Sequence, residues 1–472
     1  MNTNEDNGKS KHLQRNLTFL NAWSLAFGGA IGWGAFVMPG TTFLKKAGTL
    51  GTLIAIEIGA FIMLVISYAY GYMINKIPVS GGEFVYAEHA FGKKHGFICA
   101  WFLGLCYLNI IPMNATALCL VFRAIFGKLF QFGFHYTVAG YDIYFGELFL
   151  AIVALIIFAL VTSRGIQFSG IVQTVMVIIL LIGVLLVMFK AIVSPFAKPE
   201  NIHPLFYPDK RSALSQIISI LVIAPWAFVG FDIVPQLAEE ANFSQDRVKV
   251  IMDACIMCGC FVYIVLNFIA VSVIPEGYSN WVEYVNASNN FTGTNSILTF
   301  SAAYKVAGYG GLLLIGASAL CAMTTGMLCF YAATSRLLYS LARDNLIPAW
   351  FGKLNKNSVP FNAVIFCMCV SILAPFAGRN ALGWTVDMSS IGGAIGFGYT
   401  SLAAYKYSRL ENRIDISIFG MLGFIFSVAF ALLLLIPIPG LDSSLAKESY
   451  LLLIIWIVMG VIFFLRHKVN YN

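Results

Sequence analysis

The chain has 472 residues, of which 59% are hydrophobic and only 11% are charged. Soluble globular proteins carry about 25% charged residues, so this composition excludes a water-soluble protein of this length. The net charge of +7 comes mainly from Lys and Arg in predicted loops. It indicates a membrane surface rather than a nucleic acid as the charged partner.

Twelve apolar stretches follow one another along the chain, each long enough for a transmembrane helix. In order they are 17–43, 50–75, 96–126, 144–163, 170–193, 213–238, 249–274, 307–333, 361–378, 384–406, 416–438 and 449–465. The flank before Leu17 shows no cleavage site, so the first stretch is expected to remain as a permanent helix. The number of stretches is even, and Lys and Arg are concentrated in alternate loops. Together these features predict a multi-pass protein of the cell membrane (plasma or inner membrane) with both termini in the cytoplasm.

The first and sixth stretches contain residues that interrupt a helix. The first carries four glycines within residues 28–34, and the sixth carries a glycine between two prolines (Gly28, Gly29, Gly32 and Gly34; Pro225, Gly230 and Pro235). Irregular backbone is tolerated at membrane depth only where it lines a cavity or is buried in protein. Glycine packing faces and proline kinks are the alternative explanation. However, the interruptions lie in matching positions of helices 1–5 and 6–10, which is typical of inverted-repeat transporters.

These features predict an all-α membrane protein with about 12 transmembrane helices, a leucine-transporter-type 5+5 inverted repeat, and broken helices 1 and 6. The predicted segments are a cytoplasmic tail (1–16), a first five-helix repeat (17–193), a second, inverted repeat (213–406), two accessory helices (416–465) and a cytoplasmic tail (466–472). The ten Cys residues lie within apolar stretches, so we expect neither a disulfide framework nor a metal site. Cys255, Cys258 and Cys260 are better explained as small apolar fillers than as ligands.

Four motifs occur in order along the chain. They are Ile31–Gly40, the loop 78–86 (PVSGGEFVY), Gly230-Phe231-Asp232 followed by Glu239-Glu240, and Ser335-Arg336 leading to 342–348 (ARDNLIP) and Pro360. Together they resemble the amino acid–polyamine–organocation (APC) superfamily of permeases over helices 1 through 10. The resemblance implies a secondary active transporter, not an enzyme, that moves an amino acid or related amine across the lipid bilayer without a cofactor, with H⁺ or Na⁺ as the candidate coupling ion. An amino acid or polyamine exchanger and a transporter-like nutrient sensor are the rival interpretations.

A zwitterionic substrate needs donors for its carboxylate and acceptors for its ammonium, and a broken helix supplies both from its backbone. The predicted donors are the N–H groups of Gly32, Trp33 and Gly34. The predicted acceptors are unwound carbonyls near Ala30, Ile31, Trp226, Ala227 and Phe228, with Val229 and Gly230 completing the lining. The resemblance implies the same arrangement and suggests Trp226 as a gate over the substrate.

Trp33 departs from the family pattern, because the middle residue of this Gly-x-Gly loop is usually a small hydroxyl residue. Its indole shrinks the pocket, stacks on the substrate, or packs against a neighbouring helix while its backbone still binds. The sequence leaves these alternatives open.

Two places in the sequence are candidates for ion coupling. Glu57 is the lone carboxylate in helix 2, where an ionisable side chain costs roughly 2.5–3.5 kcal/mol, so it carries a proton or is a neutral acid hydrogen-bonded between helices. Thr324 and Thr325 in helix 8 are a candidate sodium site together with helix 1 carbonyls, unless their hydroxyls bond back to their own helix. Some APC members carry a lysine in helix 5 in place of sodium. This chain has none near the matching position, Leu180.

Four further acidic residues lie in or beside predicted helices. Asp232 is expected to cap the inner half of helix 6, and Glu239 and Glu240 are expected to pair with basic residues near the cytoplasmic end. Asp387 in helix 10 has no assigned role. No His-Glu zinc motif or Gly-x-Ser-x-Gly elbow occurs, which argues against an intramembrane enzyme.

Overall fold

The computed structural model describes residues 13–138, 140–288, 291, 293–379 and 381–466, and its regular structure is almost entirely helical. The helices up to α10 are α1 (Phe19–Ala30), α2 (Trp33–Met38), α3 (Leu44–Lys76), α4 (Glu83–Phe91), α5 (Lys93–Phe126), α6 (Phe145–Ser163), α7 (Ile166–Ile192), α8 (Ala213–Leu221), α9 (Ala224–Phe228) and α10 (Ile233–Gln236). The later helices are α11 (Asp246–Ser272), α12 (Trp281–Ala287), α13 (Leu298–Arg343), α14 (Phe361–Ser371), α15 (Ala381–Leu410), α16 (Ile414–Leu435) and α17 (Lys447–Arg466). A π-helical turn (Pro39–Phe43) joins α2 to α3, and an antiparallel hairpin of β1 (His135–Val138) and β2 (Tyr141–Tyr144) precedes α6.

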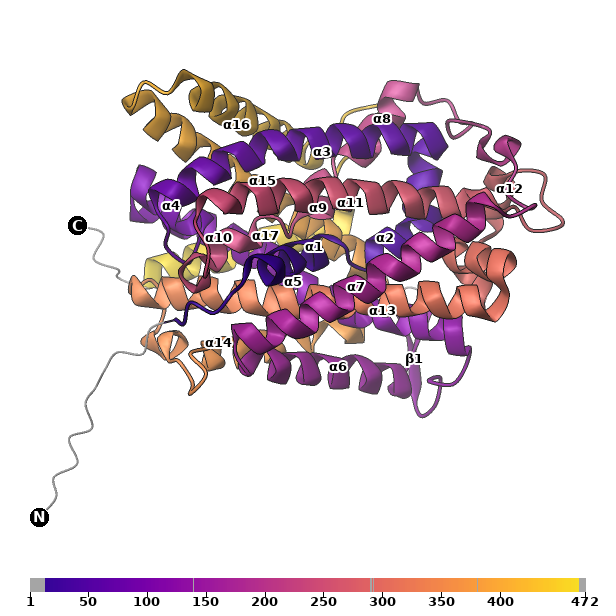
Figure 1. The fold of residues 1–472 in the computed structure, drawn as a ribbon, viewed down its shortest axis with the longest axis horizontal. Coiled ribbons are helices and arrows are strands. Elements are labelled where there is room, and N and C mark those ends of the chain that lie inside the picture. The colour runs from indigo at the N-terminus through magenta and orange to yellow at the C-terminus, as the bar shows by residue number, and fades with distance from the viewer. Residues whose placement is uncertain (1–12, 139, 289–290, 292, 380, 467–472) are drawn as a thin grey trace, which may run out of the picture.

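The long helices run roughly along one direction and form a bundle (Figure 1). In it α3 packs beside α11, and α13 packs beside both α5 and α7. We name the end that carries β1 and α12 the hairpin end, and the opposite end, with α4 and the last turns of α13, the Arg336 end (Figure 1). The short helix α1 lies inside the bundle, packed against α7, α11 and α13, and nine of its 12 residues are buried.

The outer surface of the bundle is apolar. Eight helical stretches of the described chain are long and apolar enough to cross a membrane. Helices α7, α16 and α17 expose large apolar side chains along their lengths, among them Ile182, Ile425 and Ile455. Such a surface would aggregate in water, whereas lipid tails cover it in a bilayer. The prediction of an all-α membrane protein is confirmed apart from the small hairpin, while the twelve spans and the 5+5 repeat stay predictions.

Both predicted helix breaks occur, and each is shorter than its sequence pattern. In helix 1 only Ile31 and Gly32 are irregular, between α1 and α2. Helix 6 is divided into α8, α9 and α10, with irregular backbone at 229–232. The predicted acceptor residues 226–228 are therefore helical, because Pro225 sits in the first turn of α9, where a missing N–H costs nothing.

Gly28 and Gly29 lie inside α1, where they allow close helix packing and do not interrupt the helix. A Cβ on Gly28 would lie 2.3 Å from Nε2 of Gln173, and one on Gly29 would lie 2.6 Å from Sγ of Cys329. Both distances are far below van der Waals contact, so these glycines let α7 and α13 approach α1 closely.

Helix α13 is longer than the predicted span 307–333. It begins at Leu298 and continues across non-helical backbone at Ala307 and Gly308. The turns before this kink include Ser301 and Lys305, which lower the local hydropathy, so a search for apolar runs begins only at the kink.

Candidate functional site

The two helix breaks touch each other through their backbones. Gly230 has a φ of +138°, and a Cβ there would lie 2.3 Å from the backbone N of Ala30 and 2.7 Å from the carbonyl carbon of Gly29. Glycine is required at this position both by the backbone conformation and by the contact. The breaks of helices 1 and 6, which are distant in sequence, therefore form one site.

Backbone polar groups at the helix 1 break are left without partners. Among the described residues, no group donates to the carbonyls of Ala30 or Ile31, and no group accepts from the N–H of Gly34. The N–H of Trp33 is directed at Oδ1 of Asn114 on α5, at 3.4 Å. A buried backbone group without a partner is costly, so this break is suited to a ligand that brings both a donor and an acceptor.

Two tryptophans cover the break. The ring centroids of Trp33 and Trp226 are 6.0 Å apart, and both side chains are buried. A Cβ on Gly34 would lie 2.2 Å from Cη2 of Trp226, whereas one on Gly32 would lie 3.0 Å from Oδ1 of Asn114. The indole of Trp226 therefore lies directly against the backbone at Gly34. Trp33 packs beside it, and its Nε1 has no partner among the described residues.

A cavity of about 810 Å³ leads toward this tryptophan pair from the hairpin end. Trp33 lines the cavity together with the first turns of α15 and the segment 442–450. Its charged lining residues are Lys46, Arg379, Asp387, Asp442 and Lys447. Asp387, which had no predicted role, accepts hydrogen bonds from the hydroxyl of Ser449 at 2.6 Å and from the N–H of Ala446 at 3.1 Å, and so fixes the start of α17.

Thr325 and Thr324 face different neighbours. The hydroxyl of Thr325 donates to the carbonyl of Gly28 on α1 at 3.2 Å and also lies within hydrogen-bonding distance of carbonyls of its own helix. The hydroxyl of Thr324 bonds to the carbonyls of Leu320 and Cys321 and faces Sδ of Met176. Only Thr325 of the predicted sodium pair therefore contacts helix 1.

Gln173 on α7 is a site residue that the sequence analysis missed. Its Nε2 lies 3.2 Å from the carbonyl of Ser24 and 3.3 Å from that of Thr325, so the amide joins α7 to both α1 and α13. It lies about two turns before Leu180, the position that matches the helix 5 lysine of some APC members. The available signal was an amide within an apolar run, which has to find a buried partner.

Glu57 lies on the outer face of α3, and its side chain is exposed. No hydrogen bond or ion pair to it occurs within the described chain. The structure thus places the predicted coupling carboxylate away from the helix breaks, and its role in coupling stays a prediction.

Two other carboxylates, Asp232 and Glu83, are fully buried beside the helix 6 break. Asp232 accepts from the N–H of Gly230 at 2.7 Å and from the hydroxyl of Tyr107 at 2.6 Å. The prediction that it caps the inner half of helix 6 is wrong: it occupies the N-cap position of α10 but makes no cap bond. The reason is that the irregular turn leaves the N–H of Gly230 free, and the side chain folds back to it.

Glu83, in the loop motif at the start of α4, lies on the other side of Tyr107. The hydroxyls of Tyr70 and Tyr107 lie 2.9 and 3.2 Å from its Oε1, and the amide of Gln236 donates to its Oε2. Burial, followed by the neighbouring carboxylate of Asp232, raises the pKa of Glu83 well above its usual range.

Glu239 and Glu240 pair with basic residues at the Arg336 end, as predicted. Glu240 receives Nη2 of Arg336 at 2.8 Å and Nε at 3.1 Å, and both side chains are buried. Glu239 pairs with Arg343 at 2.8 Å and accepts the N–H of Ser80 at 3.2 Å. These bonds hold together the loop before α4, the turn after α10 and the end of α13.

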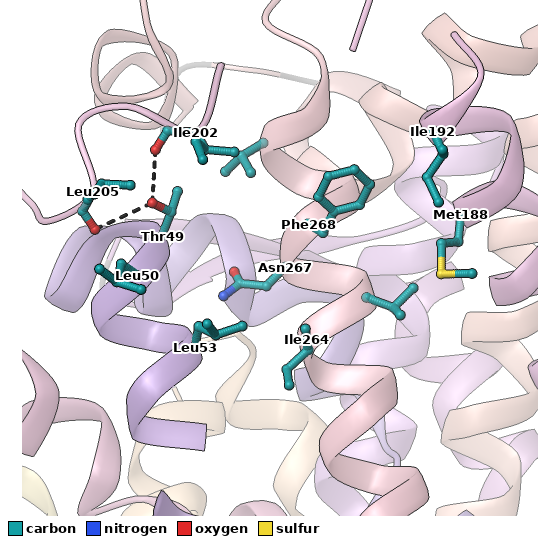
Figure 2. A pocket seen from close by; sticks show the side chains of 12 residues that line it. Thr49, Leu50, Leu53, Met188, Ile192, Ile202, Leu205, Ile264, Asn267 and Phe268 are labelled. Atoms are coloured by element: carbon teal, nitrogen blue, oxygen red, sulfur yellow. Dashed lines mark hydrogen bonds between the residues drawn. The ribbon is translucent and has the colours of Figure 1, made fainter. Parts of the chain in front are cut away.

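A separate cavity of about 410 Å³ lies between α3, α7 and α11, away from the breaks (Figure 2). Its lining is apolar except for Asn267 and Thr49, and Thr49 already bonds to the carbonyls of Ile202 and Leu205 (Figure 2). A lining with so few polar groups does not suit a zwitterion.

Comparison with known proteins gives a consistent result. The sequence model of the family described as amino acid permease matches residues 17–463. The methylthioribose transporter of Bacillus subtilis (strain 168) is 26% identical over 471 residues, which cover 98% of this chain and 95% of that protein. The branched-chain amino acid permease BcaP of the same organism is 28% identical over 375 residues, covering 77% and 75%. The arginine/ornithine antiporter of Pseudomonas aeruginosa is 23% identical over 355 residues, covering 74% and 68%.

Proposed function

We propose, from the premise that this chain belongs to the amino acid permease family, that it carries a small zwitterionic substrate across the cell membrane by alternating access at the two helix breaks. The family is one of transporters rather than enzymes, and the apolar helices fit a multi-pass membrane protein. The twelve-span, 5+5 arrangement belongs to this proposal, because the two broken helices hold corresponding places in it.

The observation that carries the proposal is the backbone contact between the breaks, beside unpaired polar groups. The free N–H of Gly34 and the start of α2 receive the substrate carboxylate. The carbonyls of Ala30 and Ile31 accept from its ammonium. Trp226 and Trp33 cover the substrate from the hairpin end, so that binding displaces an indole from the backbone at Gly34.

The side chains near the break favour a substrate with an uncharged side chain. Trp33 and Trp226 are apolar apart from their ring nitrogens, and Asn114 is neutral. Asp232 is buried and already accepts two hydrogen bonds. A charged substrate side chain would lose its hydration here without gaining an ionic partner.

Counterflow in proteoliposomes tests the proposal. Vesicles preloaded with one amino acid at high concentration are diluted into the same labelled compound, and uncharged, basic and acidic amino acids, polyamines and methylthioribose then compete. We expect saturable counterflow for uncharged amino acids and weak competition by arginine and glutamate. Absence of counterflow for every compound, with folded protein in the vesicles, would contradict transport. Binding without counterflow would indicate a sensor.

The orientation has its own test. The Lys and Arg bias assigns the Arg336 end to the cytoplasm, so the hairpin end faces outward. Glu276 is 94% exposed near α12, and Lys356 is exposed between α13 and α14. In intact cells an impermeant thiol reagent should label Glu276→Cys and spare Lys356→Cys, after subtraction of labelling of the parent chain. The opposite pattern would invert the orientation.

A further inference from the structure

The buried carboxylates Glu83 and Asp232 lack a cationic partner. They come from α4 and from the helix 6 break, and the hydroxyl of Tyr107 lies within hydrogen-bonding distance of both. No Lys, Arg or His of the described residues forms a hydrogen bond or ion pair with either carboxylate. Arg336, the buried base at this end, is matched by Glu240. Two unneutralised carboxylates in a buried site cannot both be charged without a large desolvation cost, so one of them holds a proton.

The buried titratable groups that lie near enough to interact electrostatically with the pair are neutral in their ordinary forms. They are Tyr70 of α3, Tyr86 of α4, Cys99, Cys106 and Tyr107 of α5, Cys255 of α11 and Cys329 of α13. All seven side chains are buried. None of them supplies a positive charge, so only a bound proton lowers the charge of the pair, from −2 to −1.

Gln236 gives an independent sign of a proton site. Its Nε2 donates to Glu83, while its Oε1 is buried and has no donor among the described residues. Rotation of the amide by half a turn would present Oε1 to Glu83 instead. Gln236 can therefore donate to a charged Glu83 or accept from a protonated one, which is what a carboxyl that changes its protonation state requires.

The pair also connects the two parts of the molecule that have to move. Asp232 holds the N–H of Gly230, which packs on the backbone of α1 at the substrate site. Glu83 begins α4, directly after the loop in which Ser80 bonds to Glu239 and Ser340 at the Arg336 end. A shift of the helix 6 break or an opening of the Arg336 end would change the hydrogen bonds of the pair.

We propose that Glu83 and Asp232 share one transported proton, which they take up on one side of the membrane and release on the other as the Arg336 end opens. The O–H bond that forms on uptake breaks on release, and no electron is transferred. The inference rests on the proposed transport function and assigns its coupling ion. It replaces the exposed Glu57 with a buried pair as the proton carrier.

The test measures counterflow and proton-driven accumulation separately in proteoliposomes. For one proton per substrate, a gradient of one pH unit supports about tenfold accumulation. We expect this in the wild-type protein, with substrate entry acidifying the lumen. Counterflow without any response to the pH gradient would overturn the inference and leave the transport function intact, whereas loss of both would contradict the transport function itself.

Neutral isosteres then identify the carrier. Glu83→Gln and Asp232→Asn should each reduce the accumulation ratio to about one, and Glu83→Gln should slow counterflow far less than it reduces accumulation. A merely structural role would lower both measurements together. Glu57→Gln tests the rival proton carrier. Glu276→Gln, which changes an exposed carboxylate near α12, is the matched control. Retained accumulation in both Glu83→Gln and Asp232→Asn, or its loss only in Glu57→Gln, would overturn the inference.

Infrared spectroscopy of the wild-type protein covers the case in which these variants fail to fold. A shared proton should give the carbonyl-stretch band of a buried carboxylic acid at neutral pH. Where the variants fold, the band should disappear in at least one of them. Absence of the band in the wild-type protein would overturn the inference.

Discussion

The two ends of the bundle hold their charges in opposite ways. At the Arg336 end, the side chains of Arg336 and Glu240 are 0% and 2% exposed. At the hairpin end, Lys46 and Asp442 pair at 3.2 Å with side chains 33% and 60% exposed, on the wall of the large cavity. Removing one partner of a buried pair leaves an unpaired charge in the interior and strongly lowers the stability. An exposed pair contributes only about 0–1 kcal/mol to the stability, because water solvates both members.

This difference shows which end is closed. The buried pair at the Arg336 end joins α13 to the turn after α10, and the hydroxyl of Ser340 adds a bond of 2.9 Å to the carbonyl of Ser80. The hairpin end instead has a cavity that reaches Trp33. In the proposed alternating-access cycle, the buried pair would have to separate when the Arg336 end opens, so we expect it to stabilise the conformation described here.

The largest expected effect comes from Glu240→Gln. The change leaves the buried guanidinium of Arg336 without its counter-charge, which should cost about 3–5 kcal/mol. Thermal unfolding in detergent measures the loss. Glu239→Gln is the matched control, because Glu239 and its partner Arg343 are 27% and 36% exposed, and it should cost about 1 kcal/mol or less. Equal losses of stability in the two variants would contradict the conclusion that the Arg336 end is closed to water.

The tryptophan cover of the helix 1 break, which lies between the two ends, is tested by comparing Gly34→Ala with Gly32→Ala. The first places a Cβ 2.2 Å from the ring of Trp226, and the second places one 3.0 Å from Oδ1 of Asn114. Gly34→Ala should therefore displace the tryptophan cover and lower counterflow by about 100-fold. Gly32→Ala should lower it less, because its Cβ would overlap its nearest neighbour by a smaller amount. Similar counterflow in both variants would remove Trp226 from the cover of the site.

A smaller effect should distinguish Thr325→Val from Thr324→Val. Thr325 bonds to Gly28 across the contact between α13 and α1, so its loss should cost about 1 kcal/mol in thermal unfolding. Thr324 bonds to carbonyls of its own helix and, outside it, to the weak acceptor Sδ of Met176, so its loss should stay within about 0.5 kcal/mol. Measured in the same proteoliposomes, sodium-dependent counterflow that disappears in both variants would restore the sodium interpretation of the pair.

The smallest effect is expected at the hairpin end. Lys46→Met removes the exposed pair with Asp442 and should change the stability by about 1 kcal/mol or less. Thermal unfolding at low and high salt measures it, since a solvated pair is screened. A loss comparable to that of Glu240→Gln would show that the two ends do not differ in the way their exposures indicate.

The helix breaks could be predicted from the sequence because glycine and proline act locally. Which residues are irregular could not, because tertiary contacts decide that. Gly28 stays helical while it packs against Gln173, and the α9 residues Trp226 and Phe228 stay helical ahead of a turn that begins at 229. The partners of Glu239 and Glu240 were found in outline, because acidic residues beside a basic motif at one end have few alternatives.

The buried carboxylate pair lay beyond sequence reasoning. Glu83 stands in a loop motif and Asp232 in a broken helix, and only the packing of α4 against α5 and α10 brings them to one tyrosine. The sequence indicates Glu57 because it is the lone carboxylate in an apolar helix. Since α3 is apolar on all sides, its sequence does not tell which face is exposed.

Two backbone hydrogen bonds of Leu17 join the start of α1 to the turn after helix 6. Its N–H donates to the carbonyl of Glu240, and its carbonyl accepts the N–H of Asn242, both at 2.9 Å. In the proposed transport cycle, opening of the Arg336 end exposes these two amides to water, and their hydrogens then exchange for deuterium. Their exchange rate should therefore report how often this end opens, without any label on the protein.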